Sequence, residues 1–263
     1  MYETILFEKS NGVATIALNR PDKLNSFNGV LHEEILDALN EAAGDEETRC
    51  IVLRGEGKGF SAGADLADVM EGDGNADGPD LGEYLRKTYG RLITRIVSIE
   101  KPIVAVLHGP VYGAGLGLAL ACDLRLAADS AKFSVAFIKI GLIPDAGVTF
   151  FLPRIVGLGR AMHMSMLGEA LDAEEAHRVG LVNKVVPDER LEEETATLAG
   201  QLAGLPTLAL GRIKQTLHKS FEADLAAALE AEAVGQALCG YTQDHKEGVA
   251  AFFEKRDPAF IGR

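Results

Sequence analysis

Tryptophan is absent from this 263-residue chain, and aromatic residues make up only 6% of it. Cysteine is also scarce. The three that occur, Cys50, Cys122 and Cys239, are far apart and form no C-x-x-C pair. That excludes a disulfide framework or a zinc motif and is typical of a reducing compartment. Basic residues are outnumbered, with 26 Lys and Arg against 39 Asp and Glu and a net charge of −13. We therefore expect no nucleic-acid partner, because phosphate contacts need a basic surface.

Long apolar runs are missing too. The uncharged stretch of residues 109–122 is too short and too rich in glycine to span a membrane. The N-terminus lacks the basic and apolar regions of a signal peptide, so we expect a cytoplasmic protein without a membrane partner. The remaining composition, 47% hydrophobic and 25% charged, is that of an ordinary globular protein. The length suits one large domain, or a core domain with an appendage.

The pattern of apolar residues predicts strands that alternate with helices. Residues 2–8 and 12–18 indicate a hairpin that turns at Ser10-Asn11-Gly12. Further along we expect a helix over 28–43, a strand over 50–54, a helix over 81–96, a strand over 102–107, a helix over 114–121, and strands over 124–128 and 183–186. The acidic, glycine-rich segment 71–80 should be a loop. This alternation predicts an α/β fold.

The C-terminal part is predicted to be helical. From Glu189 to Glu254 the sequence indicates four helices, with breaks near residues 204–206, 220 and 240. These helices have too few apolar residues to build a core of their own. We therefore expect them to dock on another subunit.

A single carboxylate, Asp145, stands in the largely apolar segment 131–152. A carboxylate in apolar surroundings either forms an ion pair or hydrogen bonds, or it takes part in a reaction. Asp145 also follows a proline and precedes an apolar run, which is the pattern of a helix N-cap. Both interpretations stay open on position alone.

Glycine-containing loops cover residues 57–66, 108–117 and 141–147. Small residues let a ligand approach the backbone, and helix N-termini offer free N–H groups. Two such termini that face each other would form an oxyanion hole, although each loop taken singly is more simply a turn with close helix packing. Gly113-Ala-Gly-Leu-Gly117 lies in mid-chain and lacks the G-x-G-x-x-G spacing. We therefore expect no nicotinamide cofactor.

Several motifs in a fixed order cover nearly the whole chain. They are Arg20-Pro-Asp-Lys-Leu-Asn25, Phe60-Ser-Ala-Gly-Ala-Asp-Leu66, Lys101-Pro-Ile-Val-Ala-Val106, Ala170-Leu-Asp-Ala-Glu-Glu-Ala176 and Phe252-Phe-Glu-Lys-Arg256. With this order and spacing the sequence resembles the crotonase (enoyl-CoA hydratase/isomerase) superfamily. The resemblance implies an α/β spiral of ββα units over 1–200 that binds an acyl-CoA thioester. It implies a C-terminal helical oligomerisation region over 201–263 that builds a homotrimer or a dimer of trimers. It implies no metal and no cofactor, since coenzyme A is part of the substrate.

The resemblance also assigns roles to residues. The thioester oxygen would accept hydrogen bonds from the backbone N–H groups of Ala64 and Ala114, where the family usually has glycine at the second position. Phe137 and Ile143 would line the acyl pocket. The residues implied to bind coenzyme A are Lys23, Leu24, Ala62, Ala64, Asp65, Leu66, Phe252 and Lys255. Of these, Phe252 and Lys255 would come from a neighbouring subunit.

The acidic residues select the reaction within this superfamily. Its hydratases use two glutamates, and alignment of the loops places Gly117 and Phe137 there. Hydration needs one group to activate water and another to deliver a proton, so we expect no efficient hydration. Asp145 stands where isomerases of 1,2-epoxyphenylacetyl-CoA and 3-enoyl-CoAs carry their catalytic Asp. The resemblance therefore implies an isomerase, in which apolar surroundings should raise the pKa of Asp145.

Two other functions remain open. The 4-chlorobenzoyl-CoA dehalogenases of this fold place a nucleophilic Asp at the position of Asp145. They carry a Trp and a His where this chain has Phe137 and Gly90, respectively. The third alternative is a non-catalytic acyl-CoA binder, in which Asp145 only caps a helix. His108 stands beside a glycine loop, and we expect it to pack or form hydrogen bonds rather than to catalyse.

Overall fold

The computed structural model describes residues 2–71 and 80–263, so the loop expected over 71–80 lies almost entirely outside the described residues. The core is a six-stranded sheet in the order β1-β2-β3-β4-β6-β9. Its strands are β1 (Ile5–Ser10), β2 (Val13–Leu18), β3 (Cys50–Gly55), β4 (Ile103–Leu107), β6 (Leu124–Ala128) and β9 (Lys184–Val186). Strands β1 and β2 are antiparallel, and the other pairs are parallel.

The hairpin at the edge of the sheet confirms the predicted turn. Ser10 pairs with Val13, and the two residues between them have positive φ, 51° at Asn11 and 78° at Gly12. Such a two-residue turn matches the twist of the strands that it joins, and Asn-Gly is its preferred sequence. The first strand begins three residues later than expected.

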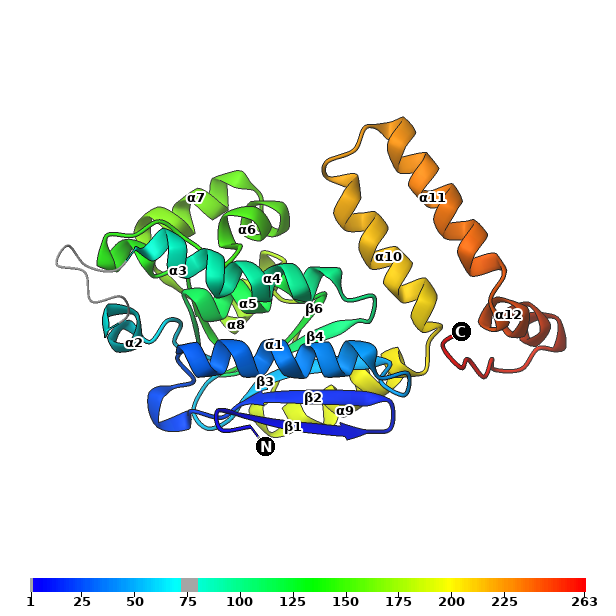
Figure 1. The fold of residues 1–263 in the computed structure, drawn as a ribbon, viewed down its shortest axis with the longest axis horizontal. Coiled ribbons are helices and arrows are strands. Elements are labelled where there is room, and N and C mark those ends of the chain that lie inside the picture. The colour runs from blue at the N-terminus through cyan, green and yellow to red at the C-terminus, as the bar shows by residue number, and fades with distance from the viewer. Residues whose placement is uncertain (1, 72–79) are drawn as a thin grey trace.

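Helices cover both faces of this sheet (Figure 1). The α-helices before the C-terminal region are α1 (Gly29–Gly44), α2 (Leu66–Glu71), α3 (Leu81–Lys87), α4 (Tyr89–Ser98), α5 (Ala114–Ala121), α6 (Val148–Val156), α7 (Leu158–Leu167), α8 (Ala173–Arg178) and α9 (Leu191–Ala203). On one face, α9 packs on Val52 and Val104. Ile51 and Leu53 belong to the larger core on the other face. A strand that is buried on both faces of the sheet has apolar side chains on both faces. This explains the continuous runs of apolar residues in β3 and β4.

Two expectations about the elements need correction. The helix expected over 81–96 is two helices, because Thr88 leaves helical geometry with φ −111° and ψ −91°. A second sheet, in the order β5-β7-β8, was not predicted. Its strands β5 (Pro110–Tyr112), β7 (Lys132–Ser134) and β8 (Ala170–Asp172) have three residues each. Three residues are too few to show a reliable alternation of apolar and polar side chains.

The C-terminal helices form where the sequence predicts them. They are α10 (Thr207–Ser220), α11 (Leu225–Gly240) and α12 (Gln243–Glu254). Helices α10 and α11 form an antiparallel pair (Figure 1), in which α10 has buried residues and α11 has none. Residue 200 lies within α9, which packs on the sheet, and α10 is bonded to α4 through Lys214, so the projecting part begins at α11. The docking of the C-terminal helices on another subunit stays a prediction. No helix in the described part of the chain is long and apolar enough to cross a membrane.

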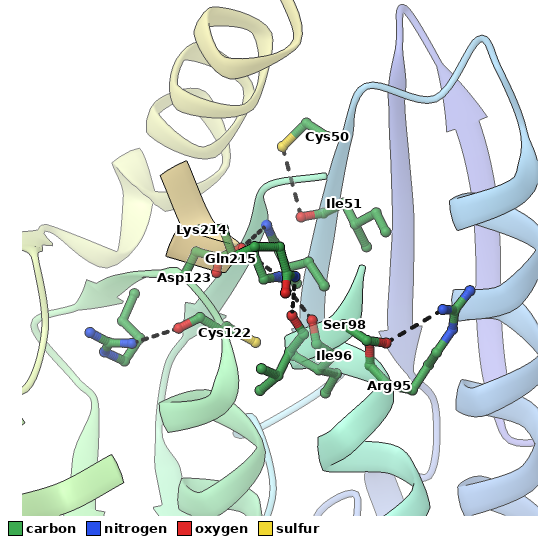
Figure 2. Close-up of polar contacts among 12 residues, drawn as sticks. Cys50, Ile51, Arg95, Ile96, Ser98, Cys122, Asp123, Lys214 and Gln215 are labelled. Carbon is green, nitrogen blue, oxygen red and sulfur yellow. Dashed lines mark hydrogen bonds and ion pairs between the residues drawn. The ribbon is translucent and has the colours of Figure 1, made fainter. Parts of the chain in front are cut away.

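A buried ion pair anchors α10 to the core (Figure 2). Lys214 Nζ lies 3.0 Å from Asp123 Oδ2 and donates to the carbonyl of Ile96 at 2.8 Å. Asp123 also accepts from the backbone N–H of Ile103, at the start of β4. Burial raises the pKa of Asp123 in spite of the attraction of Lys214. The pair therefore links α10, α4 and the sheet at one point, which fixes the angle at which the C-terminal helices leave the core.

Candidate active site

Two backbone amides without acceptors lie next to each other where two glycine loops touch. Phe27 donates to Gly63 O at 2.8 Å and accepts from Asp65 N at 2.9 Å, so the N–H of Ala64 between them is left free. Ala114 is the first residue of α5, where an N–H group has no partner within the helix. Among the described residues no acceptor is recorded for either amide.

The contact between the loops requires glycine at residue 63. A Cβ atom on Gly63 would lie 3.0 Å from Tyr112 O and 3.4 Å from Ala114 N, and its φ is +99°. The free amides of residues 64 and 114 are therefore held side by side by backbone packing. Two preorganised N–H donors at a helix N-terminus can stabilise an oxygen on which negative charge develops.

Asp145 is not a helix cap, and that hypothesis is wrong. Ala146 and Gly147 adopt left-handed conformations with φ 49° and 80°, so α6 begins only at Val148. The N-cap is Gly147, with no side-chain hydrogen bond, and only the backbone carbonyl of Asp145 accepts from Val148 N. Asp145 Oδ1 is buried with no hydrogen-bond partner in the described part of the chain. Burial raises the pKa of this carboxyl from 3.8 to about 6, which confirms the predicted direction.

The loop that carries Asp145 packs directly on α5. A Cβ atom on Gly117 would lie 2.5 Å from the carbonyl oxygen of Ala146 and 2.8 Å from its Cβ. Residue 117 therefore has no room for a side chain, and in particular none for a glutamate. Gly117 is three residues after Ala114, which is about 5 Å along the helix. The backbone next to Asp145 therefore packs about one helical turn along α5 from the free amide of Ala114.

Phe137 and Ile143, both expected in the acyl pocket, have different surroundings. Phe137 is 7% exposed, and its ring lies 3.8 Å from the position of a Cβ atom on Gly113. It therefore borders the free amides. Ile143 is 81% exposed, so it does not line a pocket within this chain. Its two neighbours, Leu142 and Pro144, are half-buried, and the side chain between them points away.

The residues expected to bind coenzyme A fall into two groups. The motifs that contain Lys23, Leu24, Ala62, Asp65 and Leu66 meet, because Ala62 N donates to Leu24 O at 2.9 Å. Phe252 and Lys255 belong to the end of α12, on the opposite side of the molecule from α2 (Figure 1). Phe252 is 79% exposed. This chain does not bring them to its own amides, and their contribution to a neighbouring subunit stays a prediction.

Arg20 has a role that the sequence did not reveal. Its guanidinium pairs with Asp65 at 3.0 Å and also donates to the carbonyl of Ser26. Burial acts to raise the pKa of Asp65, but the hydrogen bond and charge of Arg20 outweigh it, and the pKa is lowered. Asp65 is therefore a structural anion that holds the loop of Ala64 in place. The ring of His108 makes a hydrogen bond with Gly57 O at 3.0 Å, as expected.

Two free N–H groups can polarise a carbonyl oxygen, and a buried carboxyl such as that of Asp145 can exchange a proton. Residues 8–263 match the family model described as enoyl-CoA hydratase/isomerase. The chain belongs to this family, whose members act on acyl-CoA thioesters, and the expected crotonase fold is confirmed.

Relatives of different activity are similar to this chain to a comparable degree. One is 1,2-epoxyphenylacetyl-CoA isomerase of Escherichia coli, 43% identical over all of both chains. Another is a probable enoyl-CoA hydratase of Rhodobacter capsulatus, 44% identical over 100% of this chain and 99% of the relative. Among solved structures, enoyl-CoA hydratase of Bacillus anthracis superposes with a TM-score of 0.90 at 32% identity, covering 99% of this chain and 100% of that one.

Proposed function

We propose that the protein is an enoyl-CoA isomerase that moves a double bond, or rearranges a ring epoxide, by proton transfer through Asp145. The observation that carries the proposal is the buried, unpartnered Oδ1 of Asp145, whose carboxyl has a pKa of about 6. Such a carboxyl is ionised in most molecules at neutral pH, yet it can hold a proton long enough to return it.

The reaction needs one acid and two amides. The thioester oxygen accepts from the N–H groups of Ala64 and Ala114, and the carboxylate of Asp145 removes a proton from carbon 2 of a 3-enoyl-CoA. The electron pair shifts toward the thioester and forms a dienolate, whose negative charge the two amides stabilise. Asp145 then returns the proton to carbon 4, and the product is the conjugated 2-enoyl-CoA.

Hydration is less well supported by the same residues. It needs a second acidic group. Packing against Ala146 leaves no room for one at Gly117, and residue 137 is phenylalanine. The names of the relatives do not decide the question, since the Escherichia coli isomerase and the Rhodobacter hydratase are similarly close to this chain. The side chains present favour the isomerase.

Nucleophilic displacement of a halide is the second candidate. An unpartnered carboxylate oxygen such as Asp145 Oδ1 can also attack an activated aromatic carbon and form an ester. A water molecule must then be activated to release the product. The dehalogenases that this chain resembles carry His where it has Gly90, and Trp where it has Phe137. This candidate is therefore ranked second.

A panel of three thioesters separates the candidates. Purified protein is incubated with 3-hexenoyl-CoA, crotonyl-CoA and 4-chlorobenzoyl-CoA. The readouts are absorbance of the conjugated product, the mass gained on hydration, and released chloride. We expect isomerisation to be the fastest reaction. Hydration faster than isomerisation would overturn the proposal, and chloride release would select the second candidate. Binding of coenzyme A thioesters without any turnover would identify a binder.

A further inference from the structure

Ser61 is bonded to both of the loops that carry the free amides. Its side chain is fully buried, with 0% of its surface exposed. The hydroxyl donates to the backbone carbonyl of Asn25 at 2.8 Å and accepts from the backbone N–H of Gly63 at 3.1 Å. This hydroxyl therefore joins the segment of Asn25 to the residue that precedes the free amide of Ala64.

Gly63 needs the hydrogen bond from its N–H group because glycine has little conformational preference of its own. Its φ is +99°. Its carbonyl accepts from Phe27 N at 2.8 Å, and its N–H donates to Ser61 Oγ, so both of its polar groups are held. The peptide that joins Gly63 to Ala64 is planar, so its orientation decides where the Ala64 N–H points. Without the Ser61 hydroxyl, Gly63 could rotate and turn that N–H away.

The backbone of Ser61 holds the segment that leads to the second amide. Ser61 N donates to Pro110 O at 3.0 Å, and Ser61 O accepts from Tyr112 N at 2.9 Å. Ala114 follows two residues after Tyr112, at the start of α5. A Cβ atom on Gly115 would lie 2.7 Å from Ser61 Cβ, so the first turn of α5 rests directly on the serine. Ser61 is therefore in contact with the supports of both amides.

We propose that Ser61 is a positioning residue that sets the spacing and direction of the N–H groups of Ala64 and Ala114. This inference rests on the proposed function only in that both place a negatively charged oxygen at these amides. Preorganised donors stabilise a charged oxygen strongly, and a misplacement of about 1 Å can cost about 100-fold. Loss of the Ser61 hydroxyl should therefore weaken the binding of an enolate and leave the binding of a neutral thioester nearly unchanged.

Acetoacetyl-CoA tests the inference without isomerisation. It has an acidic proton between two carbonyl groups, and its enolate absorbs ultraviolet light in a band that the neutral form lacks. Titrations at pH 8 follow this band, and isothermal titration calorimetry measures hexanoyl-CoA, which forms no enolate. The proteins are the wild type, Ser61→Ala and the control Thr48→Val. Thr48 is 2% exposed, and its hydroxyl donates to Asp45 at 3.0 Å. Thr48 precedes β3 and Ser61 follows it, so the two lie at opposite ends of that strand.

The wild type and the control should bind the enolate more tightly than hexanoyl-CoA. Ser61→Ala should bind the enolate about 10- to 100-fold more weakly than the wild type, and hexanoyl-CoA within about threefold of it. Unchanged enolate binding in Ser61→Ala would overturn the inference. An equal loss for both ligands would overturn it too, because that is the result of a purely structural role. A wild type without preference for the enolate would have no charged oxygen to stabilise, and this also contradicts the inference. A protein that fails to isomerise 3-hexenoyl-CoA can still give the expected result.

Ser61→Cys keeps the inference testable if Ser61→Ala does not fold. Alanine leaves the N–H of Gly63 and the carbonyl of Asn25 without their partner, which lowers stability. A thiol remains a weak donor and a weak acceptor at the same place. Ser61→Cys should therefore bind the enolate about three- to tenfold more weakly than the wild type and bind hexanoyl-CoA equally well. Equal weakening of both ligands, or of neither, would refute the role of Ser61, and melting temperatures show that each variant is folded.

Discussion

Replacing Asp145 by Asn should stabilise the fold while it removes the reactive group. Burial raises the pKa of this carboxyl from 3.8 to about 6, and Oδ1 has no partner among the described residues. The charged form is therefore disfavoured in the folded state, whereas asparagine has nearly the same shape and no charge. The substitution should therefore raise the stability of the fold and lower the activity, a trade-off that is common at active sites.

The expected gain follows from the pKa. A rise from 3.8 to about 6 corresponds to about 3 kcal/mol, at about 1.4 kcal/mol per pH unit. Asp145 is only half-buried, so screening by solvent reduces this to about 1–2 kcal/mol. The melting temperature should then rise by about 2–8 °C for a chain of this size.

The gain depends on pH in a definite direction. Below pH 3.8 the carboxyl is protonated in both the folded and the unfolded state, so it costs nothing. As the pH rises, the unfolded state loses its proton first, and the wild type loses stability until the folded carboxyl ionises near pH 6. The difference between Asp145→Asn and wild type should therefore be full at pH 8 and vanish toward pH 4.

Thermal unfolding of both proteins at pH 4, 6 and 8 measures this difference. Asp65→Asn is the matched control, because Arg20 pairs with Asp65 and its pKa is lowered. That variant should lose stability at pH 8. Equal melting temperatures of wild type and Asp145→Asn at pH 8 would refute the reasoning. A gain that persists at pH 4 would refute it as well.

Three further predictions concern the site and its support. The kcat/KM for 3-hexenoyl-CoA should rise with pH to a plateau, with its midpoint near the Asp145 pKa of about 6; a flat profile from pH 5 to 8 would contradict an Asp145 base. Gly117→Ala should cost about 1–3 kcal/mol in urea unfolding and slow isomerisation, because its Cβ would meet Ala146 O; unchanged stability and rate would disprove the packing. Asp123→Asn should cost about 3 kcal/mol or more, since it leaves Lys214 buried and unpaired; a loss below about 1 kcal/mol would show that the pair is dispensable.

The sequence predicted most of the fold because the longer helices and strands have clear apolar periods and turn residues of their own. The Asn11-Gly12 turn, the apolar strands and the helical breaks near residues 206, 220 and 240 all lie close to where they were expected. The short strands of the second sheet carried no such signal. The break at Thr88 was missed because the apolar period continues across it, from Leu85 through Tyr89 to Leu92.

The site was only partly predictable from the sequence. Asp145 and the loops of Ala64 and Ala114 stand in motifs, so their positions could be read directly. The packing of His32 of α1, Tyr84 of α3 and Tyr89 of α4 against one another could not be predicted in this way. Each occupies a position on the inner face of a different helix, where a packing role is the simplest interpretation. They meet only because α1, α3 and α4 converge, and that convergence is a property of the tertiary structure.

The central claim is that one carboxylate, Asp145, carries the proton during isomerisation. Its most direct test is the turnover of 3-hexenoyl-CoA by Asp145→Asn, compared with wild type at pH 8, with binding of hexanoyl-CoA as the check on the site. We predict that turnover falls by about 100- to 10,000-fold, the usual contribution of a general acid–base group, while binding is retained. Unchanged turnover in a variant that still binds hexanoyl-CoA would contradict the account.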